Sequence, residues 1–399
     1  MSNTQKKNVP ELRFPGFEGE WEEGTVGNFL KESKIKGSSG SRAKKLTVRL
    51  WGKGVVPKKE TFKGSDNTQY YIRKAGQLMY GKLDFLNCAF GIVPDSLNNY
   101  ESTIDSPSFD FINGDPKFLL ERIKLKSFYK KFGEIANGSR KAKRINQDTF
   151  LSLLVFTPTY DEQQKIGEFF SKLDRQIELE EQKLELLQQQ KKSYMQKIFS
   201  QELRFKDDND NDYPEWEKKK LKEIAYVYTG NTPSKKENIY WNTGEYVWVT
   251  PTDINESKNI YESEHKLSQE GYKKARHLPK NTLLVTCIAS IGKNAILRKQ
   301  GSCNQQINAV VPFENVNIDY LYYISDSLSK FMKSIAGKTA TQIVNKNTFE
   351  NLGIYLASFE EQIKIGAFFS MLDVFIEKQE RKLKLLKQQK QGLLQKMFI

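Results

Sequence analysis

The chain has 399 residues, of which 38% are hydrophobic and 12% aromatic, so it can form two or more domains with hydrophobic cores, and we expect most of it to be ordered. Its longest apolar runs, such as NTLLVTCIASIG at 281–292, are too short to span a membrane, and the polar start MSNTQKKNVPE has no signal core. We therefore expect a cytoplasmic protein. Three cysteines without a CxxC spacing and only two histidines argue against a metal site.

The positive charge of the chain is clustered. The formal net charge is +14, and between residues 31 and 63 eleven Lys or Arg side chains stand against two glutamates, a net +9. Clustered cations bind polyanions because they displace counterions from phosphates. We therefore expect a polyanion as partner, with this basic stretch facing it rather than only solvent.

The first elements predicted in chain order are strands. KAGQLMYGKLDFLNCAFGIV at 74–93 alternates short apolar runs with Gly and other turn residues, a pattern typical of strands and turns. In the second half, EYVWVT at 245–250 and INAVVPF at 307–313 have the same character, and PKNTLLVTCIASIGKNAILR at 279–298 has the same rhythm as 74–93. We expect two mixed strand-and-loop units that share a fold and differ in their surface loops.

A long helix is predicted after each of these units. The sequence at 157–199 aligns without gaps to 356–398, an offset of 199 residues, and each copy opens with a capping box, Thr159 with Glu162 and Ser358 with Glu361. Apolar residues in both copies step by four and three, as in coiled coils, and polar residues interrupt them at matching positions, which we interpret as register devices for helix pairing. The residues predicted to pair the helices are Ile166, Phe170, Leu173, Ile177, Leu184, Leu187, Ile365, Phe369, Leu372, Ile376, Leu383 and Leu386.

A shorter repeat opens each half of the chain. PELRFPGFEGEWEEGTVGNFL at 10–30 and QELRFKDDNDNDYPEWEKKKLKEIA at 201–225 both contain an LRF, a turn-rich spacer and a Trp. The predicted order is a globular domain at 1–159, a helix at 160–200, a second globular domain at 201–357 and a last helix at 358–399.

Several of these motifs together resemble a known family. LRFPGFEGEW at 12–21, GNTPSKKENIYWNTGEYVWVTPTDI at 230–254, LPKNTLLVTCIASIGKNAILRKQGSCNQQINAVVPF at 278–313 and the twice-used EQxKIGxFFSxLD are similar to the specificity subunit of type I restriction-modification enzymes (HsdS). The resemblance covers nearly the whole chain. The first unit departs from it, because it lacks a GNTPS element and has ESKIKGSSGSRAKKLTV at 32–48; Ala357 also replaces the Pro that stands at 158.

The resemblance implies an α+β fold with an internal pseudo-twofold repeat. Two similar mixed α/β target-recognition domains would be joined by two long antiparallel coiled-coil helices, and each domain would read one half of a bipartite site in double-stranded DNA. Two modification subunits would dock on the helices and methylate adenine with S-adenosylmethionine, and restriction subunits would cleave and translocate DNA with ATP and Mg. The chain itself would have no catalytic residues and no cofactor.

The sequence independently lacks the motifs of these reactions. It has no GxxxxGK[ST] phosphate loop, no NPPY-like or DPPY-like motif and no paired FxGxG turn. The alternative is a DNA methyltransferase or nuclease that carries its own recognition domains. A structural coiled-coil protein would leave the basic loops unexplained.

The residues expected to contact DNA are polar or cationic side chains in loops, because such groups match base edges and phosphates. In the first unit they are Lys36, Ser39, Arg42, Lys44, Lys45, Ser139, Arg140, Lys141 and Lys143. In the second unit they are Thr232, Ser234, Lys235, Lys236, Ser290, Lys293, Lys338, Thr339, Thr341 and Gln342. Trp241, Tyr246 and Trp248 are expected in the core, since they alternate as buried strand positions do.

Overall fold

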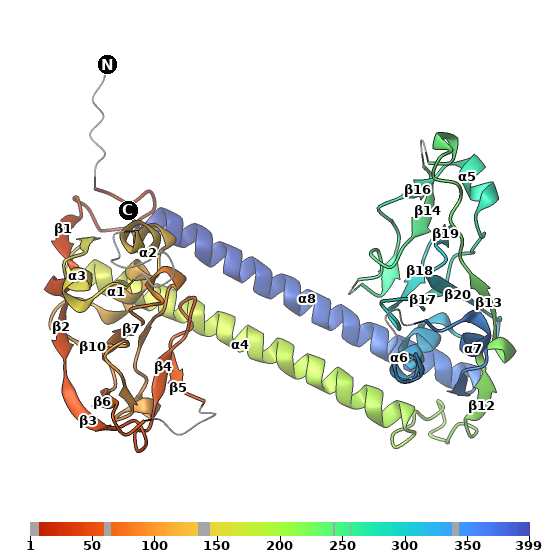
Figure 1. The fold of residues 1–399 in the computed structure, drawn as a ribbon, viewed down its shortest axis with the longest axis horizontal. Helices are drawn as coiled ribbons and strands as arrows, with labels where there is room; N and C mark the ends of the chain where they lie inside the picture. Colours follow the sequence, from red (N-terminus) through yellow and green to blue (C-terminus); the bar gives the residue numbers. More distant parts are fainter. Residues whose placement is uncertain (1–7, 60–64, 135–143, 242–243, 256, 337–342) are drawn as a thin grey trace. The chain divides into compact units, whose positions relative to one another are not determined.

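The computed structural model describes residues 8–59, 65–134, 144–241, 244–255, 257–336 and 343–399 (Figure 1). The chain divides into two compact units. Unit 1 consists of Met1–Gln182 and Arg381–Ile399, and unit 2 consists of Lys183–Glu380. Each unit therefore contains the beginning of the long helix that follows it in sequence and the end of the other long helix. Both units mix helices and strands, so the fold is α+β.

Unit 1 is built on a four-stranded antiparallel sheet in the order β2-β10-β7-β8. A three-stranded sheet, β3-β6-β9, and two pairs, β4-β5 and β1-β11, complete it. Its strands are β1 (Glu22–Thr25), β2 (Leu30–Ser33), β3 (Ile35–Ser39), β4 (Leu46–Val48), β5 (Val55–Pro57), β6 (Gln69–Ile72), β7 (Leu78–Tyr80), β8 (Phe90–Ile92), β9 (Glu101–Ser102), β10 (Ser108–Phe111) and β11 (Leu154–Thr157). Its shorter helices are η1 (Val26–Asn28), η2 (Phe85–Asn87), η3 (Asp95–Leu97), α1 (Pro116–Ile123), α2 (Lys126–Gly133) and α3 (Gln147–Leu151).

Unit 2 contains a five-stranded sheet in the order β13-β20-β17-β18-β15, a three-stranded sheet β16-β14-β19 and the pair β12-β21. Its strands are β12 (Glu217–Lys220), β13 (Ala225–Thr229), β14 (Tyr246–Val249), β15 (Asn259–Ile260), β16 (Lys266–Leu267), β17 (Thr282–Thr286), β18 (Asn294–Leu297), β19 (Gly301–Cys303), β20 (Ile307–Pro312) and β21 (Gly353–Leu356). Its shorter helices are η4 (Leu221–Glu223), η5 (Asn238–Tyr240), α5 (Gln269–Lys274), α6 (Ile318–Ile335) and α7 (Lys346–Glu350).

Each unit contains its own central sheet, and four strands have the same order in both sheets. In unit 1 the hairpin β7-β8 lies next to β10 and then β2, and in unit 2 the hairpin β17-β18 lies next to β20 and then β13. These are the hairpins expected from the shared rhythm of 74–93 and 279–298. The units differ outside this sheet, where unit 1 adds the β4-β5 hairpin and unit 2 adds β14, β16 and β19. The expectation of a common scaffold with different accessory parts is confirmed.

The long helices are α4 (Tyr160–Phe199) and α8 (Phe359–Met397), which confirms the prediction of two helices over these segments. Among the described residues, no helix is both long and apolar enough to cross a membrane.

The LRF and EQ motifs meet inside each unit. In unit 1 the Arg13 guanidinium donates to both carboxylate oxygens of Glu162, with N–O distances of 2.7 and 2.6 Å. In unit 2 Arg204 donates to both oxygens of Glu361, at 3.3 and 2.8 Å, and Trp216 Nε1 donates to the same carboxylate at 2.8 Å. The motif therefore ties the start of each half to the first turn of its long helix.

These pairs change the role of the glutamate in each predicted capping box, because its carboxylate binds an arginine. Ser358 Oγ does accept the backbone N–H of Glu361, at 3.3 Å. The carboxylates of Glu162 and Glu361 bind arginine side chains, because each is fully buried and a guanidinium supplies two charged donors.

The glutamine of each EQ pair holds a second helix. Gln163 Oε1 accepts the backbone N–H of Asp115, the N-cap of α1, and Gln362 Oε1 accepts that of Asn317, the N-cap of α6. Each Gln side chain also donates to the backbone carbonyl five residues before it, at 2.9 and 2.8 Å. The N-terminus of α1 or α6 is thereby fixed against the long helix.

Two glycines permit this close approach. A Cβ on Gly167 would lie 2.3 Å from Asp115 Oδ1 and 2.9 Å from the backbone N of Phe118. A Cβ on Gly366 would lie 2.8 Å from Asn317 Oδ1. The glycine in the KIG of the repeated motif is thus explained, because a larger residue would collide with the N-cap of the neighbouring helix.

Within each unit the two long helices run antiparallel. In unit 1 Lys390 pairs with Asp174 at 2.6 Å, and Lys382 pairs with Glu180. In unit 2 Lys191 pairs with Asp373. The Lys390–Asp174 and Lys191–Asp373 pairs are related by the 199-residue offset, and both use a polar residue that interrupts the apolar pattern. The expectation that these interruptions connect one helix to the other is confirmed.

The predicted helix-pairing residues occupy two environments. Ile166 and Phe170 pack with Trp21, Phe118 and the end of α8 in the core of unit 1, so they contact the globular part as well as a helix. Seven of the set are buried, namely Ile166, Phe170, Ile177, Ile365, Phe369, Leu372 and Leu383. Leu173, Leu184, Leu187, Ile376 and Leu386 are half-buried.

We expect Gly167→Ala to destabilise unit 1, because the added methyl group displaces Asp115 from its cap of α1. The free energy of unfolding should fall by about 1–3 kcal/mol despite the better helix propensity of Ala. Gly392→Ala is a matched control in the same unit, since a Cβ there meets nothing within 4 Å, and it should raise the free energy of unfolding by about 0.5–1 kcal/mol. Urea unfolding of both variants measures the difference; equal effects would contradict the steric explanation.

Candidate nucleic-acid interface

The candidate loops of unit 2 converge at one end of its five-stranded sheet. Thr229, the last residue of β13, pairs with Asn308 near the start of β20, and Thr286, the last residue of β17, pairs with Ile307. The loop after β13 (230–236), the β17-β18 turn (287–293) and the loop before β20 (304–306) therefore emerge together. Ile343 joins them through a β-bridge to Ile288. The topology brings the two candidate loops 230–236 and 287–293 to one end of the sheet, next to the loop 304–306.

The loop at 230–236 is held by backbone contacts and two tryptophans. A Cβ on Gly230 would lie 2.3 Å from the carbonyl oxygens of both Cys303 and Asn304, so only glycine fits there. Trp248 Nε1 donates to the Asn231 carbonyl, and Trp241 Nε1 donates to the Ser234 carbonyl, both at 3.1 Å. The glycine and the indoles therefore fix the path of this loop.

The tryptophans themselves are structural, as expected. Trp248 is buried, and Trp241 and Tyr246 pack against the cluster that it forms with Leu267 and Tyr272. Tyr246 also stacks on Tyr272 with ring centroids 4.1 Å apart.

The side chains of this loop face a polar neighbour. Thr232 Oγ1 donates to Gln305 Oε1 at 2.6 Å, and Ser234, Lys235 and Lys236 are exposed. Gln305 is exposed as well. An amide beside a hydroxyl and two ammonium groups offers donors and acceptors of the kind that bind base edges and phosphates.

Sequence reasoning missed two members of this surface. Gln305 lies in the NQQ loop before β20. Its side-chain amide, a group that binds base edges, could have marked it as a candidate from the sequence alone. Arg276 is exposed, its backbone N–H donates to Asn231 Oδ1 at 2.6 Å, and its guanidinium lies 5.4 Å from the Tyr228 ring. No local pattern marks Arg276, since its place depends on a contact with a loop 45 residues away.

Ser290 and Lys293 are exposed in the β17-β18 turn. Thr286 organises this turn, because its Oγ1 accepts the backbone N–H of Lys293 at 3.0 Å and donates to the Ser290 carbonyl. The remaining predicted residues of this unit, Lys338, Thr339, Thr341 and Gln342, lie outside the described residues.

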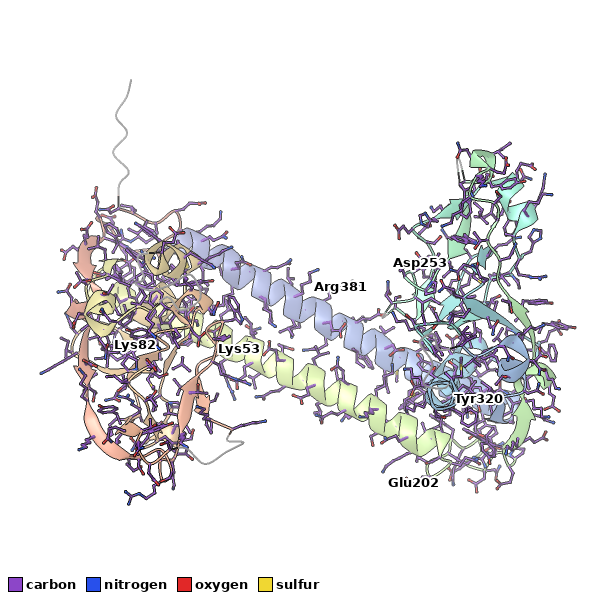
Figure 2. All side chains as sticks on the ribbon, viewed as in Figure 1. Lys53, Lys82, Glu202, Asp253, Tyr320 and Arg381 are labelled. Carbon is purple, nitrogen blue, oxygen red and sulfur yellow. The ribbon has the colours of Figure 1, made fainter. Side chains whose placement is uncertain are left out.

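Unit 1 has the same arrangement at the corresponding sheet end. Ser33, the last residue of β2, pairs with Ser108 at the start of β10, and Tyr80 at the end of β7 pairs with Phe90 at the start of β8. The start of β10 also pairs with the end of β7, so the basic segment after β2 and the turn containing Lys82, which Figure 2 labels, emerge together. The backbone N–H of Ile145 donates to the Lys82 carbonyl at 3.2 Å, as that of Val344 donates to Cys287 in unit 2.

A buried arginine closes this end of the unit 1 sheet. Arg73 donates to Ser102 Oγ at 2.7 Å, to the Ser33 carbonyl at 3.2 Å and to Ser108 Oγ at 3.0 Å. Burial lowers the pKa of Arg73 to about 10, so it stays cationic at neutral pH. It fixes the strand ends and is not available to a ligand.

The basic segment of unit 1 presents most of its predicted residues to solvent. Lys36, Arg42 and Lys44 are exposed. Ser39 is half-buried and donates to Asp66 Oδ1 at 3.0 Å. Lys45 is 7% exposed with its ammonium 5.5 Å from the Tyr70 ring, so it packs inside the unit and does not face a ligand. Ser139, Arg140, Lys141 and Lys143 lie outside the described residues.

The β4-β5 hairpin adds an aromatic side chain that the sequence did not single out. Trp51 at its tip is 60% exposed, and its neighbours Arg49 and Lys53 are exposed cations (Figure 2 labels Lys53). The backbone there is fixed, because Trp51 N–H donates to the Asn87 carbonyl at 2.8 Å and Gly52 N–H to that of Cys88 at 2.7 Å. Cations bind phosphates and an aromatic ring stacks on bases, so this tip suits a nucleic acid.

The described residues offer no reactive thiol and no metal cluster. Cys88, Cys287 and Cys303 are buried, and burial raises the pKa of their thiols to about 11, 12 and 12. Thiols with raised pKa values are poor nucleophiles and poor ligands. Within the ranges that the structure covers, no group of three or more His, Cys, Asp or Glu side chains could hold a metal ion.

Comparison with known proteins gives consistent matches. A family model described as the type I restriction modification DNA specificity domain matches residues 109–189 and 213–388. The chain is 32% identical over 208 residues to the MjaIX specificity subunit of Methanocaldococcus jannaschii, covering 50% of this chain and 48% of that protein. It is 26% identical over 167 residues to the EcoR124I/EcoR124II specificity subunit of Escherichia coli, covering 40% and 41%. The chain thus spans less than half the length of these curated relatives.

A solved structure has the same fold over nearly the whole chain. The S subunit of the type I restriction-modification system from M. genitalium superposes with a TM-score of 0.61 at 14% sequence identity, covering 98% of this chain and 99% of that one.

We predict that duplex DNA protects Trp51 from acrylamide quenching. Three of the five tryptophans, Trp21, Trp216 and Trp248, are at most 6% exposed. Trp241 is half-buried and Trp51 is 60% exposed, so the quenchable fluorescence should come mainly from Trp51. Trp51→Phe should remove most of it, and DNA at low salt should lower the quenching constant of the parent chain. An unchanged constant at saturating DNA would place Trp51 away from the nucleic acid.

Proposed function

The chain belongs to the type I restriction modification DNA specificity domain family, and on this premise we propose that it is the non-catalytic specificity subunit of such a system. Each globular unit reads one half of a bipartite site in double-stranded DNA. The observation that carries this proposal is the repeated sheet end, where unit 2 presents cations, an amide and hydroxyls from its loops and unit 1 presents the exposed cations that follow β2.

The two sheet ends differ in the chemistry they offer. Unit 2 presents Thr232 and two lysines on the loop after β13 and Gln305 on the loop before β20, whereas unit 1 presents a longer basic segment and the Trp51 hairpin. Different side chains on the same scaffold would read different bases, because each base edge has its own pattern of donors and acceptors. This supports two half-sites of unlike sequence.

Catalysis would lie in partner subunits. The relatives are named specificity subunits of type I restriction enzymes. By the family resemblance, two modification subunits would supply methyl transfer with S-adenosylmethionine, and restriction subunits would supply cleavage and translocation with ATP and Mg. Incubating the purified chain alone with S-adenosylmethionine and DNA should give no methyl transfer.

The DNA-binding proposal predicts a strong dependence of affinity on salt. Roughly 6–10 contacted phosphates would lower the affinity by about 10³–10⁵ between about 50 and 200 mM salt. Replacing Arg42 and Lys44 by Ala should reduce the slope of log affinity against log salt by about one for each phosphate that is no longer neutralised. Lys172→Ala, an exposed cation on α4, is the matched control and should leave the slope unchanged. A flat salt titration of the parent chain would contradict the proposal.

We also propose that the modification subunits dock on the outer faces of α4 and α8. Leu186 and Leu385 are related by the 199-residue offset, and each is 54% exposed. A repeated exposed leucine is what two copies of one partner would need, since each copy would meet the same surface.

Leu186→Glu combined with Leu385→Glu should therefore weaken assembly with the modification subunits while both units stay folded. The matched control is Gln196→Glu with Gln395→Glu, a second exposed pair with the same offset and the same added charge. Analytical ultracentrifugation of the mixed subunits reports the assembly. If both double variants assemble as the parent does, docking occurs elsewhere.

The paired helices would also set the distance between the two half-sites. Residues 161–199 would span about 58 Å at roughly 1.5 Å per residue, more than one DNA turn of about 34–36 Å. Ion pairs on both sides of the unit boundary fix the register, so a longer spacer requires both helices to be extended.

Inserting four helix-forming residues after Gln182 and four after Glu380 should lengthen the helices by about 6 Å, or nearly two base-pair steps. We expect unchanged half-sites separated by a longer unspecified spacer, as mapped from methylated sites in cells. An insertion after Gln182 alone should instead misalign Lys191 with Asp373 and lower stability. Retained activity with the parental spacer in the double insertion would show that the helices do not set the separation.

A further inference from the structure

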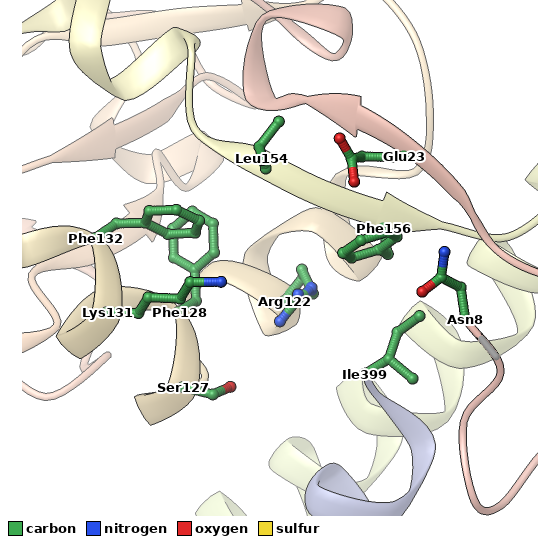
Figure 3. A pocket seen from close by; sticks show the side chains of 10 residues that line it. All are labelled: Asn8, Glu23, Arg122, Ser127, Phe128, Lys131, Phe132, Leu154, Phe156 and Ile399. Atoms are coloured by element: carbon green, nitrogen blue, oxygen red, sulfur yellow. The ribbon is translucent and has the colours of Figure 1, made fainter. Parts of the chain in front are cut away.

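Unit 1 contains a cavity of about 800 Å³ that the proposed function does not use (Figure 3). Its walls come from α1, α2 and β11, together with Asn8 and Ile399 near the two chain ends. Phe128, Phe132 and Phe156 make much of the lining apolar. A cavity of this size and character is typical of small-ligand sites.

A buried cation lines this cavity. Arg122 is 6% exposed, and its Nε and Nη1 atoms have no hydrogen-bond partner among the described residues. In the view of Figure 3 its guanidinium lies between the Phe128–Phe132 pair and Phe156. Burial lowers the pKa of Arg122 to about 10, which leaves it charged at neutral pH.

The same unit shows how a structural arginine is satisfied. Arg73 is 2% exposed, and it donates to two serine hydroxyls and two backbone carbonyls. Among the described residues, no hydrogen bond reaches the Nε and Nη1 atoms of Arg122, and the Phe128 ring lies 5.9 Å from its guanidinium. A buried charge without a partner is costly, so an anionic ligand would supply what the fold does not.

The surroundings define the ligand. A guanidinium has a planar fork that matches the two oxygens of a carboxylate, and three phenylalanine walls suit an apolar or aromatic body. Lys131 and Ser127 add one cation and one hydroxyl, whereas Glu23 repels a group of high negative charge such as a polyphosphate. We propose that this cavity binds a single carboxylate carried on an apolar or aromatic body, with Arg122 as its anchor.

The test uses 3-phenylpropionate as the probe on the full chain. Methyl groups of Leu154 and Ile399 line the cavity and report binding by nuclear magnetic resonance. Saturable shifts are expected with the acid. Binding should be at least about tenfold weaker for 3-phenylpropionamide, which lacks the carboxylate, and for inorganic phosphate, which lacks the apolar body. Absence of saturable shifts, or equal binding of amide or phosphate, would overturn the proposal.

Variants assign the binding to Arg122. Arg122→Met should weaken binding at least about tenfold, and Arg122→Lys should weaken it because the charge is kept while the fork is lost. Lys130→Met, an exposed residue on α2, is the matched control and should bind as the parent does. Unchanged binding in folded Arg122→Met would remove Arg122 from the site. If that variant does not fold, Arg122→Lys and the probe series on the parent chain still decide.

A further arm separates two sources of the carboxylate. Acetyl-Leu-Phe with a free carboxylate is compared with its amide and with 3-phenylpropionate. Tighter binding of the free dipeptide than of the small acid indicates the end of a peptide chain as ligand. Equal or weaker binding indicates a free small acid, and both results support the carboxylate site.

Discussion

The arrangement of each unit depends on a carboxylate that is removed from water. Glu162 and Glu361 are fully buried, and each is tolerated because an arginine from the start of the same half binds both of its oxygens. Breaking such a pair would leave an uncompensated buried charge, which is far more costly than losing an exposed ion pair. The neighbouring glutamine and glycine then position the cap of α1 or α6 on the long helix. One polar contact thus connects the start of each half, its helix and its globular core.

Local patterns predicted the elements of this fold well. The helices follow from a period of 3.6 residues and the hairpins from short alternating runs, and both patterns lie within one segment of sequence. The partners of the LRF arginines were not predictable in this way, because Arg13 and Glu162 are 149 residues apart and Arg204 and Glu361 are 157 apart. The division into four consecutive segments stays a prediction, since each compact unit combines parts of both long helices.

The candidate interface was predicted by residue type but not by arrangement. The choice of Lys and Ser side chains as DNA contacts stays a prediction, and the convergence of their segments at one sheet end in each unit follows from strand order, which no single loop encodes. Lys45 shows that a cluster of positive charge in the sequence does not identify which side chains are exposed. Its ammonium packs near the ring of Tyr70, 25 residues away, inside the unit. Trp51 and Arg276 were missed for the same reason, since exposure and neighbours are properties of the folded chain.

The composition of unit 1 has a consequence for its synthesis. Phe398 lies within about 6 Å of the rings of Trp21, Phe118 and Phe170 and completes their cluster. These three rings are made long before residue 398, and at roughly 5–20 residues per second the delay after the last of them, Phe170, is on the order of 10–45 s. During translation this aromatic surface is uncovered, although unit 2 already has Phe199 in the corresponding place beside Trp216. The second half of the protein can therefore complete its core before the first, the reverse of the usual order, and chaperones that shield apolar surface would act on the nascent first half.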